Sequence, residues 1–243
     1  MARVSYSKDG GVGVIRMDDG KANAQNPEFF KEIIAALGQA EKDQVRSLLL
    51  LGREKFFSAG LDLKLLPTLK PEQLVEALSG FQTYLEKLYL FPAPVVGAAN
   101  GHTLAGGMIL YLCCDYRMAV DNAAHQYGLN EMANGIPLSH FVAAICEGTI
   151  PSRVLTETVL LAKIYTAKEA LDRGIIHEMI PNPREIEALS LAKAKEFTRL
   201  QTPAVRLTKL RLRKPACEAA KARDQAEGPR GAGGFNPFAG LGR

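Results

Sequence analysis

Three segments of the sequence combine residue types that could perform chemistry together. Residues 56–63 and residues 100–107 are turns of small residues, each placed between an apolar run and a helical pattern. Such turns leave backbone N–H groups without partners at the start of a helix, where they stabilise negative charge. The third segment, residues 127–137, carries the single carboxylate Glu131 among apolar neighbours. The pattern favours a base acting beside an oxygen that two N–H groups hold.

The first turn follows the continuous apolar run Leu48–Leu51, which is typical of a strand buried on both faces. Ser58, Ala59 and Gly60 form its centre, and Asp62 is expected to cap a helix. Taken alone, the segment is best explained as an ordinary strand-to-helix turn with a capping residue.

The second turn is predicted to join a strand at 94–99 directly to a helix at 106–114. Gly106 and Gly107 would let a ligand approach the backbone and would present a further N–H group. The turn lacks both the Gly-Lys-Ser/Thr of a phosphate-binding loop and the GxGxxG of a dinucleotide-binding turn. Taken alone, it is explained equally well by glycines that let the helix contact the sheet. Two such turns together are what an oxyanion hole requires, and each donor is worth about 3–4 kcal/mol.

Glu131 is a candidate base because burial among apolar groups raises the pKa of a carboxyl group toward neutrality. The alternative is a solvated or helix-capping glutamate, which the segment alone would favour. His102, His125 and His140 match no metal-binding spacing, and the sequence has no GxSxG motif of a serine nucleophile. We therefore expect no metal, and structural or surface roles for these histidines.

In order and spacing, the three segments resemble the enoyl-CoA hydratase/isomerase (crotonase) superfamily. The resemblance covers residues 4 to 210 and includes a later stretch, Tyr165 to Ile175. It implies an α/β fold, a crotonase-like ββα spiral followed by a helical C-terminal region that builds a trimer or a dimer of trimers. It also implies an acyl-CoA thioester as the substrate, so that coenzyme A is part of the substrate and no separate cofactor is needed.

The resemblance also implies roles for individual residues. The thioester oxygen would lie between the backbone N–H groups of Ala59 and Gly106, and Glu131 would be catalytic. The other residues that it places against the substrate are Ala22, Ala24, Ser58, Gly60, Leu61, Asp62, Leu63, Gly107 and Asn130.

One position bears on the type of reaction. Hydratases of the family carry a second glutamate early in the helix after the glycines, and this chain has Ile109 there. Adding water needs a group that holds the water, whereas moving a double bond needs one base that carries a proton from C2 to C4. Residues 113–117 and 128–131 also resemble 3,2-trans-enoyl-CoA isomerases. The alternatives are another crotonase reaction, hydration or thioester hydrolysis, and a non-catalytic member that binds RNA or protein.

The remaining sequence predicts the elements that must position these groups. The chain has 243 residues, 47% hydrophobic and 23% charged, which excludes a disordered chain and a coiled coil. We expect a catalytic core over 1–183, a helical region over 184–227 and a glycine-rich tail over 228–243. Strands are predicted at 4–7, 12–17, 48–51, 94–99, 116–120 and 175–180, and helices from 27, at 71–90, 106–114, 137–147, 152–162, 167–173, 183–200 and 203–225.

The net charge of +4 is unevenly distributed. Residues 184–243 contain 13 Lys and Arg against 6 Asp and Glu, while residues 1–183 are net acidic. Because residues 184–225 contain one aromatic, Phe197, we expect no nucleic-acid binding and instead assign the basic excess, including Lys209, Arg211 and Arg213, to the phosphates of coenzyme A.

The four cysteines and the apolar runs bear on the compartment. The cysteines form no CxxC motif, the N-terminus has no apolar signal core, and the most apolar stretch is broken by polar residues and glycines. We therefore expect a cytoplasmic protein without a membrane segment.

Overall fold

The computed structural model describes residues 2–228, and its largest element is a six-stranded sheet. The first two strands form an antiparallel hairpin, as predicted, and all the other neighbours are parallel. In their order across the sheet, the strands are β1 (Val4–Asp9), β2 (Val12–Met17), β3 (Ser47–Leu51), β5 (Val95–Ala99), β7 (Tyr116–Val120) and β9 (Glu178–Ile180).

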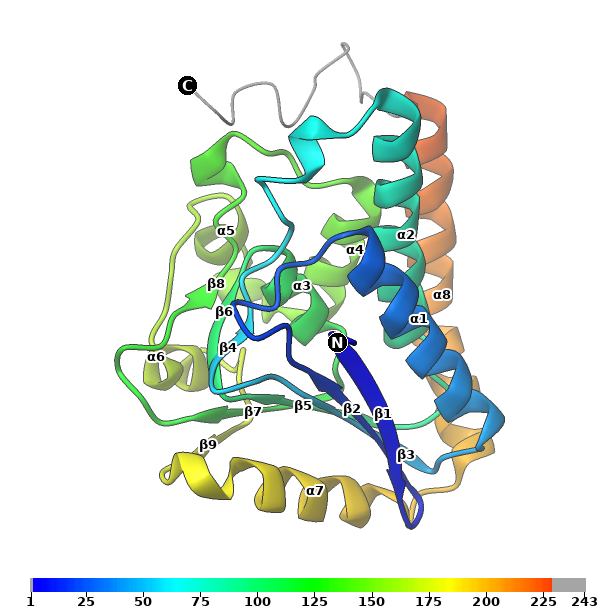
Figure 1. The fold of residues 1–243 in the computed structure, drawn as a ribbon, viewed down its shortest axis with the longest axis vertical. Helices are drawn as coiled ribbons and strands as arrows, with labels where there is room; N and C mark the ends of the chain where they lie inside the picture. The colour runs from blue at the N-terminus through cyan, green and yellow to red at the C-terminus, as the bar shows by residue number, and fades with distance from the viewer. Residues whose placement is uncertain (1, 229–243) are drawn as a thin grey trace.

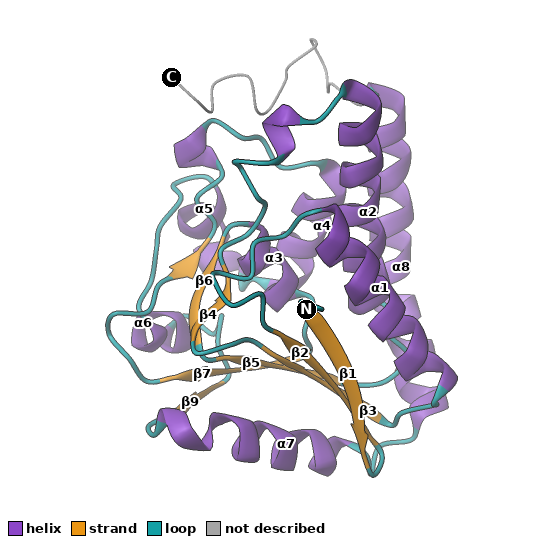
Figure 2. Cartoon of the chain, in the orientation of Figure 1, coloured by secondary structure: helices purple, strands orange, loops and turns teal. Residues whose placement is uncertain are grey.

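A second sheet contains three short parallel strands, β4 (Lys55–Ser58), β6 (Gly101–Leu104) and β8 (Tyr127–Gly128). These strands run steeply across the direction of β5 and β7 (Figure 2). Each of β3, β5 and β7 is followed along the chain by one of these short strands and then by helical structure (Figure 1). This repeat confirms the predicted α/β spiral of ββα units.

The short second strands were not predicted, and residues 101–104 form β6 rather than a turn. Their backbone groups pair with β4 on one side and with β8 on the other. Gly101 is required because a Cβ atom there would collide with the backbone of Lys55. A strand of four residues has too few side chains for the alternation of polar and apolar positions to be visible.

The helices agree with the sequence prediction in number and order, with shifted ends. They are α1 (Pro27–Lys42), α2 (Pro71–Tyr89), α3 (Gly106–Leu112), α4 (His140–Thr149), α5 (Ser152–Val159), α6 (Ala167–Asp172), α7 (Ile186–Phe197) and α8 (Thr202–Glu227), with short 3-10 helices at Leu66–Thr68, Met132–Asn134 and Pro183–Glu185. The Asn26 side chain caps α1 by accepting a hydrogen bond from the Phe29 N–H, as expected.

Three predicted boundaries were wrong for identifiable reasons. Helix α4 starts at His140 rather than 137 because the Ser139 hydroxyl accepts the Val142 N–H. The strand predicted at 175–180 covers only Glu178–Ile180, since the Ile175 carbonyl accepts a hydrogen bond from the Arg117 side chain. Asp62 caps no helix; its carboxylate accepts the N–H groups of the two residues at 64 and 65 within a turn.

The larger sheet is covered on both faces. Helix α7 packs against one face, and the small sheet and the other helices cover the opposite face (Figure 1). Side chains from β3 point alternately into the two cores: Leu48 and Leu50 into the larger, Leu49 and Leu51 into the smaller. This burial on both faces explains the continuous apolar run of that strand.

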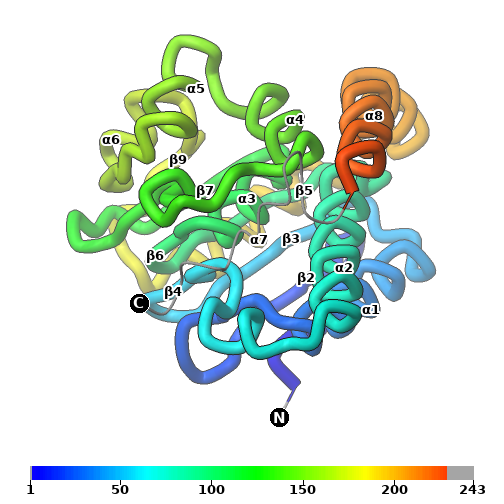
Figure 3. Tube along the Cα trace, turned by 90° about the horizontal axis from the view of Figure 1, so that it is seen from above, coloured from blue at the N-terminus to red at the C-terminus, as the bar shows by residue number. Residues whose placement is uncertain are grey.

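Helix α8 lies beside α2 (Figure 3) and is fixed there by charged side chains, of which Lys209 is buried and Asp115 and Arg213 are half-buried. The Asp115 carboxylate accepts a hydrogen bond from the Lys209 ammonium at 2.8 Å and forms an ion pair with the Arg213 guanidinium at 2.8 Å. Arg213 also donates to the Tyr89 carbonyl and lies over the ring of that residue. The prediction that Lys209 and Arg213 bind coenzyme A phosphates is therefore wrong, because both cations are paired inside the protein; Arg211 is exposed.

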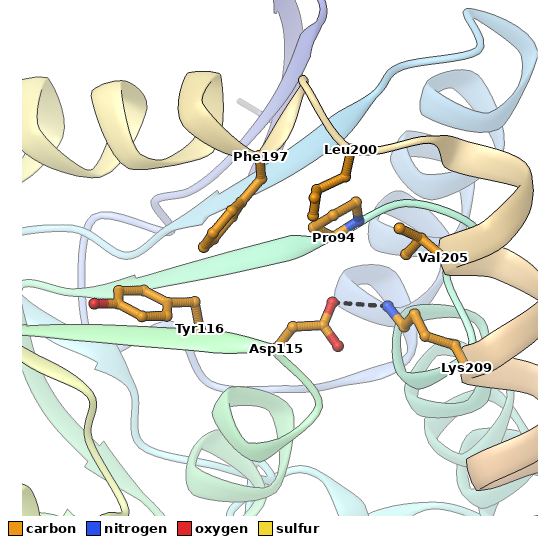
Figure 4. A pocket seen from close by; sticks show the side chains of 7 residues that line it. All are labelled: Pro94, Asp115, Tyr116, Phe197, Leu200, Val205 and Lys209. Atoms are coloured by element: carbon orange, nitrogen blue, oxygen red, sulfur yellow. Dashed lines mark hydrogen bonds and ion pairs between the residues drawn. The ribbon is translucent and has the colours of Figure 1, made fainter.

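The Asp115–Lys209 pair borders a cavity of about 240 Å³ between the end of α7 and the start of α8 (Figure 4). Its other lining side chains come from α7, the α7–α8 connection and the sheet, and are mainly apolar. The cavity belongs to the junction of α8 with the sheet, away from the three segments that carry the candidate chemistry.

Two further sequence expectations concern the ends of the chain and membranes. The predicted tail at 228–243 lies outside the described residues apart from Gly228. Among residues 2–228, no helix combines the length and the apolar character that crossing a membrane requires.

The contacts of Asp115 with Lys209 and Arg213 predict how one substitution changes the stability of the protein. Replacing Lys209 with Met leaves Asp115 with fewer partners, and we expect the free energy of unfolding to fall by about 2–3 kcal/mol. The matched control is Lys214→Met, which removes an exposed pair with Glu218 and should cost less than about 1 kcal/mol. Urea unfolding of both variants measures the difference, and equal losses would contradict the anchoring role.

Candidate active site

The three short parallel strands bring the three candidate segments together. Ser58, Thr103 and Tyr127 pair side by side across β4, β6 and β8. Because parallel strands all end at the same edge of a sheet, the loops that follow them leave from one edge. These loops contain residues 59–62, 105–107 and 129–131, which are the parts that the sequence analysis selected for chemistry.

In the first loop, the free N–H group within residues 2–228 is that of Leu61 rather than that of Ala59. The Ala59 N–H donates to the Ala22 carbonyl at 2.9 Å, so it is not available to a ligand. Leu61 forms a parallel bridge with Gln25, whose backbone bonds to the residues on either side of Leu61. The Leu61 N–H therefore points away from Gln25, and it has no hydrogen-bond partner within residues 2–228. The prediction for Ala59 was wrong by two residues.

The free N–H group of the second loop is that of Gly106, the residue predicted as a donor; its role toward a ligand stays a prediction. It is the first residue of α3, and its N–H has no partner in the described part of the chain. The preceding residue, Ala105, has a φ of 49° and a ψ of −130°, a strained conformation that aims the start of the helix. A Cβ atom on Gly106 would lie 3.4 Å from the Leu61 nitrogen, so the two free N–H groups are neighbours.

Two glycines make this approach of the loops possible. Gly60 has a φ of +89°, and a Cβ atom there would lie 2.8 Å from the Gly106 nitrogen. A Cβ atom on Gly107 would collide with the backbone of Ser58. Both glycines are buried where the two loops pack together, and the predicted substrate contacts of Gly60 and Gly107 stay predictions.

Ser58 also has a structural role instead of the predicted contact with substrate. Its side chain is fully buried, and its hydroxyl donates to the Asn23 carbonyl at 2.8 Å. The same oxygen accepts hydrogen bonds from the Gly60 N–H and from the Gln25 side chain. The hydroxyl is thus satisfied within the protein.

The other predicted substrate-binding residues surround the loops. Ala22 and Ala24 are half-buried in the loop that holds the Ala59 N–H, Asp62 is half-buried in its turn, and Leu63 is exposed beyond it. Asn130 is half-buried, and its carbonyl accepts hydrogen bonds from the backbone and side chain of Asn134.

Glu131 lies three residues after the end of β8, at the start of the 3-10 helix Met132–Asn134. The residue is 8% exposed, and its Oε2 atom is buried without a hydrogen-bond partner among the described residues. Burial raises the pKa of this carboxyl group to about 7. It is the only carboxylate among the buried side chains of residues 2–228.

Burial is the main cause of the raised pKa of Glu131. Cys146 on α4 lies near enough for the Glu131 charge to add to the effect of burial, which raises the pKa of the thiol to about 12. Ile109, one turn into α3, is buried at the position where the family resemblance places the second glutamate of hydratases. Among the buried side chains of residues 2–228, Glu131 is thus the one carboxyl group that could transfer a proton.

The histidines take no part in this arrangement. The His102 and His125 rings contact each other, with 5.6 Å between their centroids, on the short strand β6 and the loop before β8. No group of three or more metal-ligating side chains occurs within the part of the chain that the structure describes.

A model of the enoyl-CoA hydratase/isomerase family matches residues 7–228. The chain belongs to this family. It is 30% identical over 220 residues to enoyl-CoA delta isomerase 1 of Rattus norvegicus, a match that covers 89% of this chain and 76% of the relative. It is also 30% identical to the probable enoyl-CoA hydratase EchA17 of Mycobacterium tuberculosis, over 79% of this chain and 72% of the relative.

The solved structures support the same fold. The crystal structure of human mitochondrial delta3-delta2-enoyl-CoA isomerase superposes with a TM-score of 0.87 at 29% identity, covering 92% of this chain and 88% of that one. The chain thus shares the fold of the family, and similar proteins carry both isomerase and hydratase names.

The buried carboxylate predicts a pH-dependent stability. The folded-state pKa of about 7 exceeds the reference value of 4.5, so the folded protein keeps a proton that the unfolded chain loses. Stability therefore falls as the pH rises from 4.5 to 7. Replacing Glu131 with Gln should raise the free energy of unfolding by up to about 3 kcal/mol at pH 8, and by less than about 1 kcal/mol at pH 5.

Urea unfolding at the two pH values measures this effect. The matched control is Glu147→Gln on α4, where the exposed side chain should be replaceable at either pH with little effect. A gain for Glu131→Gln that is the same at pH 5 and pH 8 would show that burial of the charge is not its cause.

Proposed function

We propose that the protein is an enoyl-CoA isomerase that moves a double bond from C3 to C2 of an acyl-CoA thioester. The observation that carries this proposal is Glu131, the one buried carboxylate of residues 2–228, in the loop after β8 at the same sheet edge as the loops that hold the Leu61 and Gly106 N–H groups. The apolar Ile109 supports it, because a hydratase needs a further group to hold water. The similarity to isomerases of rat and human agrees with this choice.

The mechanism uses only groups of this chain. Ionised Glu131 removes a proton from C2 of a 3-enoyl-CoA, and the electron pair of the C–H bond delocalises into the thioester. The Leu61 and Gly106 N–H groups donate hydrogen bonds to the oxygen of the resulting dienolate. Protonated Glu131 then returns the proton at C4, which places the double bond between C2 and C3. The product is an isomer of the substrate, so no co-reactant is consumed.

The same proposal covers the ligand and the assembly. Coenzyme A enters as part of the substrate, and no separate cofactor or metal takes part. We propose a homotrimer or a dimer of trimers. The RNA-binding alternative is weakened by the basic residues of α8, of which Lys209, Arg213 and Lys221 are paired within the fold.

The substrate test compares two thioesters. Purified protein should convert 3-hexenoyl-CoA to the 2-trans isomer and should leave crotonyl-CoA largely unhydrated, because Ile109 cannot activate water. Absorbance of the conjugated thioester follows both reactions. Faster hydration of crotonyl-CoA than isomerisation of 3-hexenoyl-CoA would establish the hydratase alternative.

Glu131→Gln supplies the control for that test. The amide keeps the shape of the side chain and cannot accept a proton, so isomerisation should fall by at least about a hundredfold. Binding of saturated hexanoyl-CoA should change little, since no proton moves on binding. Near-normal turnover by this variant would exclude Glu131 as the base.

The pKa of Glu131 also predicts the pH dependence of the reaction. Because the base must be ionised and its pKa is about 7, kcat/KM for 3-hexenoyl-CoA should fall about tenfold per pH unit below 7 and level off above it. Initial rates between pH 5 and 9 measure this profile. A flat profile across pH 5–7 would contradict a buried carboxyl group as the base.

A further inference from the structure

One buried side chain joins both loops of the oxyanion hole. Gln25 is fully buried, and its backbone bonds to the Gly60 carbonyl and to the Asp62 N–H, on either side of Leu61. Its side-chain Nε2 donates to the Gly106 carbonyl at 3.1 Å. The same residue is therefore attached to the first donor through its main chain and to the second through its amide group.

The orientation of this amide is fixed by a second buried residue. The Tyr84 hydroxyl, on α2, donates to Gln25 Oε1 at 2.7 Å. With its oxygen held there, the amide presents Nε2 to two acceptors, the Gly106 carbonyl and the Ser58 hydroxyl at 3.2 Å. Burial raises the pKa of Tyr84 well above its usual range, so the hydroxyl remains a donor.

The position of Tyr84 is itself rigid. Its ring contacts three phenylalanine rings, with centroid separations of 5.5 to 5.9 Å, from Phe29, Phe30 and Phe81. The hydrogen bonds of Gln25 thus connect the two loops to a packed aromatic cluster. Without them, a buried amide would destabilise the core, because each of its polar atoms would lack a partner.

The strained backbone of Ala105 needs neighbouring contacts such as the hydrogen bond from Gln25 to Gly106. Its positive φ is costly for a residue with a side chain, and it persists only where neighbouring contacts hold the backbone. Gln25 supplies such a contact at the next residue, through the Gly106 carbonyl. Small changes in donor position have large effects on rate when the donors must fit an oxygen whose charge develops during the reaction.

We infer that Gln25 is a positioning residue that sets the spacing of the Leu61 and Gly106 N–H groups, with Tyr84 holding its amide in register. The inference rests on the proposed function, since it assigns these two groups to the thioester oxygen. In this role Gln25 contacts neither the substrate nor Glu131 and acts only through the two loops.

Two variants and one matched control test this inference. Gln25→Leu keeps the side-chain volume and removes every amide hydrogen bond, and Tyr84→Phe removes one hydroxyl and keeps the ring. We expect kcat for 3-hexenoyl-CoA to fall about tenfold to a hundredfold in the first and about threefold to tenfold in the second. KM should change less than about threefold in both. The control, Tyr6→Phe, removes a hydroxyl that donates to the Asp43 carboxylate, outside the three loops of the site. Its kcat should stay within about twofold of the wild-type value.

A spectroscopic readout separates positioning from a general loss of structure. The probe is hexanoyl-CoA labelled with 13C at the thioester carbonyl, which is saturated and cannot react. Two well-placed N–H groups lower its carbonyl stretching frequency on binding to the wild-type protein. We expect a smaller downshift with Gln25→Leu and Tyr84→Phe, and the full downshift with Glu131→Gln and Tyr6→Phe.

The outcomes distinguish this inference from the proposed function. Wild-type kcat and a full downshift in Gln25→Leu, or no downshift in wild-type protein that binds the probe, would overturn the positioning role. Should the wild-type protein bind the probe with a downshift and yet fail to isomerise 3-hexenoyl-CoA, the isomerase proposal fails. The infrared comparison of the variants then still decides the role of Gln25, and Tyr84→Phe decides it if Gln25→Leu does not fold.

Discussion

The alignment of three short parallel strands is the constraint on which the rest of the site depends. β4, β6 and β8 pair at Ser58, Thr103 and Tyr127, and each is followed within a few residues by a group with a chemical task. A shift in one pairing would move a donor or the carboxylate by a residue spacing, about 3.3 Å, which is longer than a hydrogen bond. The larger sheet and its helices hold these strands in place by anchoring the strand that precedes each one.

The carboxylates of half-buried Asp115 and buried Glu131 differ in whether their charge has a partner. Asp115 accepts hydrogen bonds from Lys209 and from the Val95 N–H and forms an ion pair with Arg213, and these contacts fix α8 against the sheet. Glu131 is buried and has an oxygen without any partner in the described residues. The first arrangement stabilises the fold. The burial of Glu131 lowers the free energy of unfolding as the pH rises from 4.5 to 7. It leaves a carboxylate that can take up a proton, as general-base catalysis requires.

Long elements with clear periodicity were predictable. Helices α1 and α2 followed from apolar periodicity over more than ten residues, β3 from a continuous apolar run, and the family resemblance from motifs in a fixed order. The short strands of the small sheet were not predictable, because two to four residues show no period and pair only with segments distant in the chain. The division into three regions stays a prediction.

The sequence by itself determined the fold class, the candidate base Glu131, the Gly106 donor and the absence of a second acid at Ile109, since these depend on residue identity and local spacing. Tertiary structure alone decided which N–H group in the first loop is free: Ala59 donates to Ala22, and the bridge to Gln25 turns the Leu61 N–H outward. It likewise placed Lys209 and Arg213 on Asp115 instead of on a ligand. The physical reason is that the partner of a hydrogen bond or charge is set by packing between segments far apart in the chain, which local sequence does not encode.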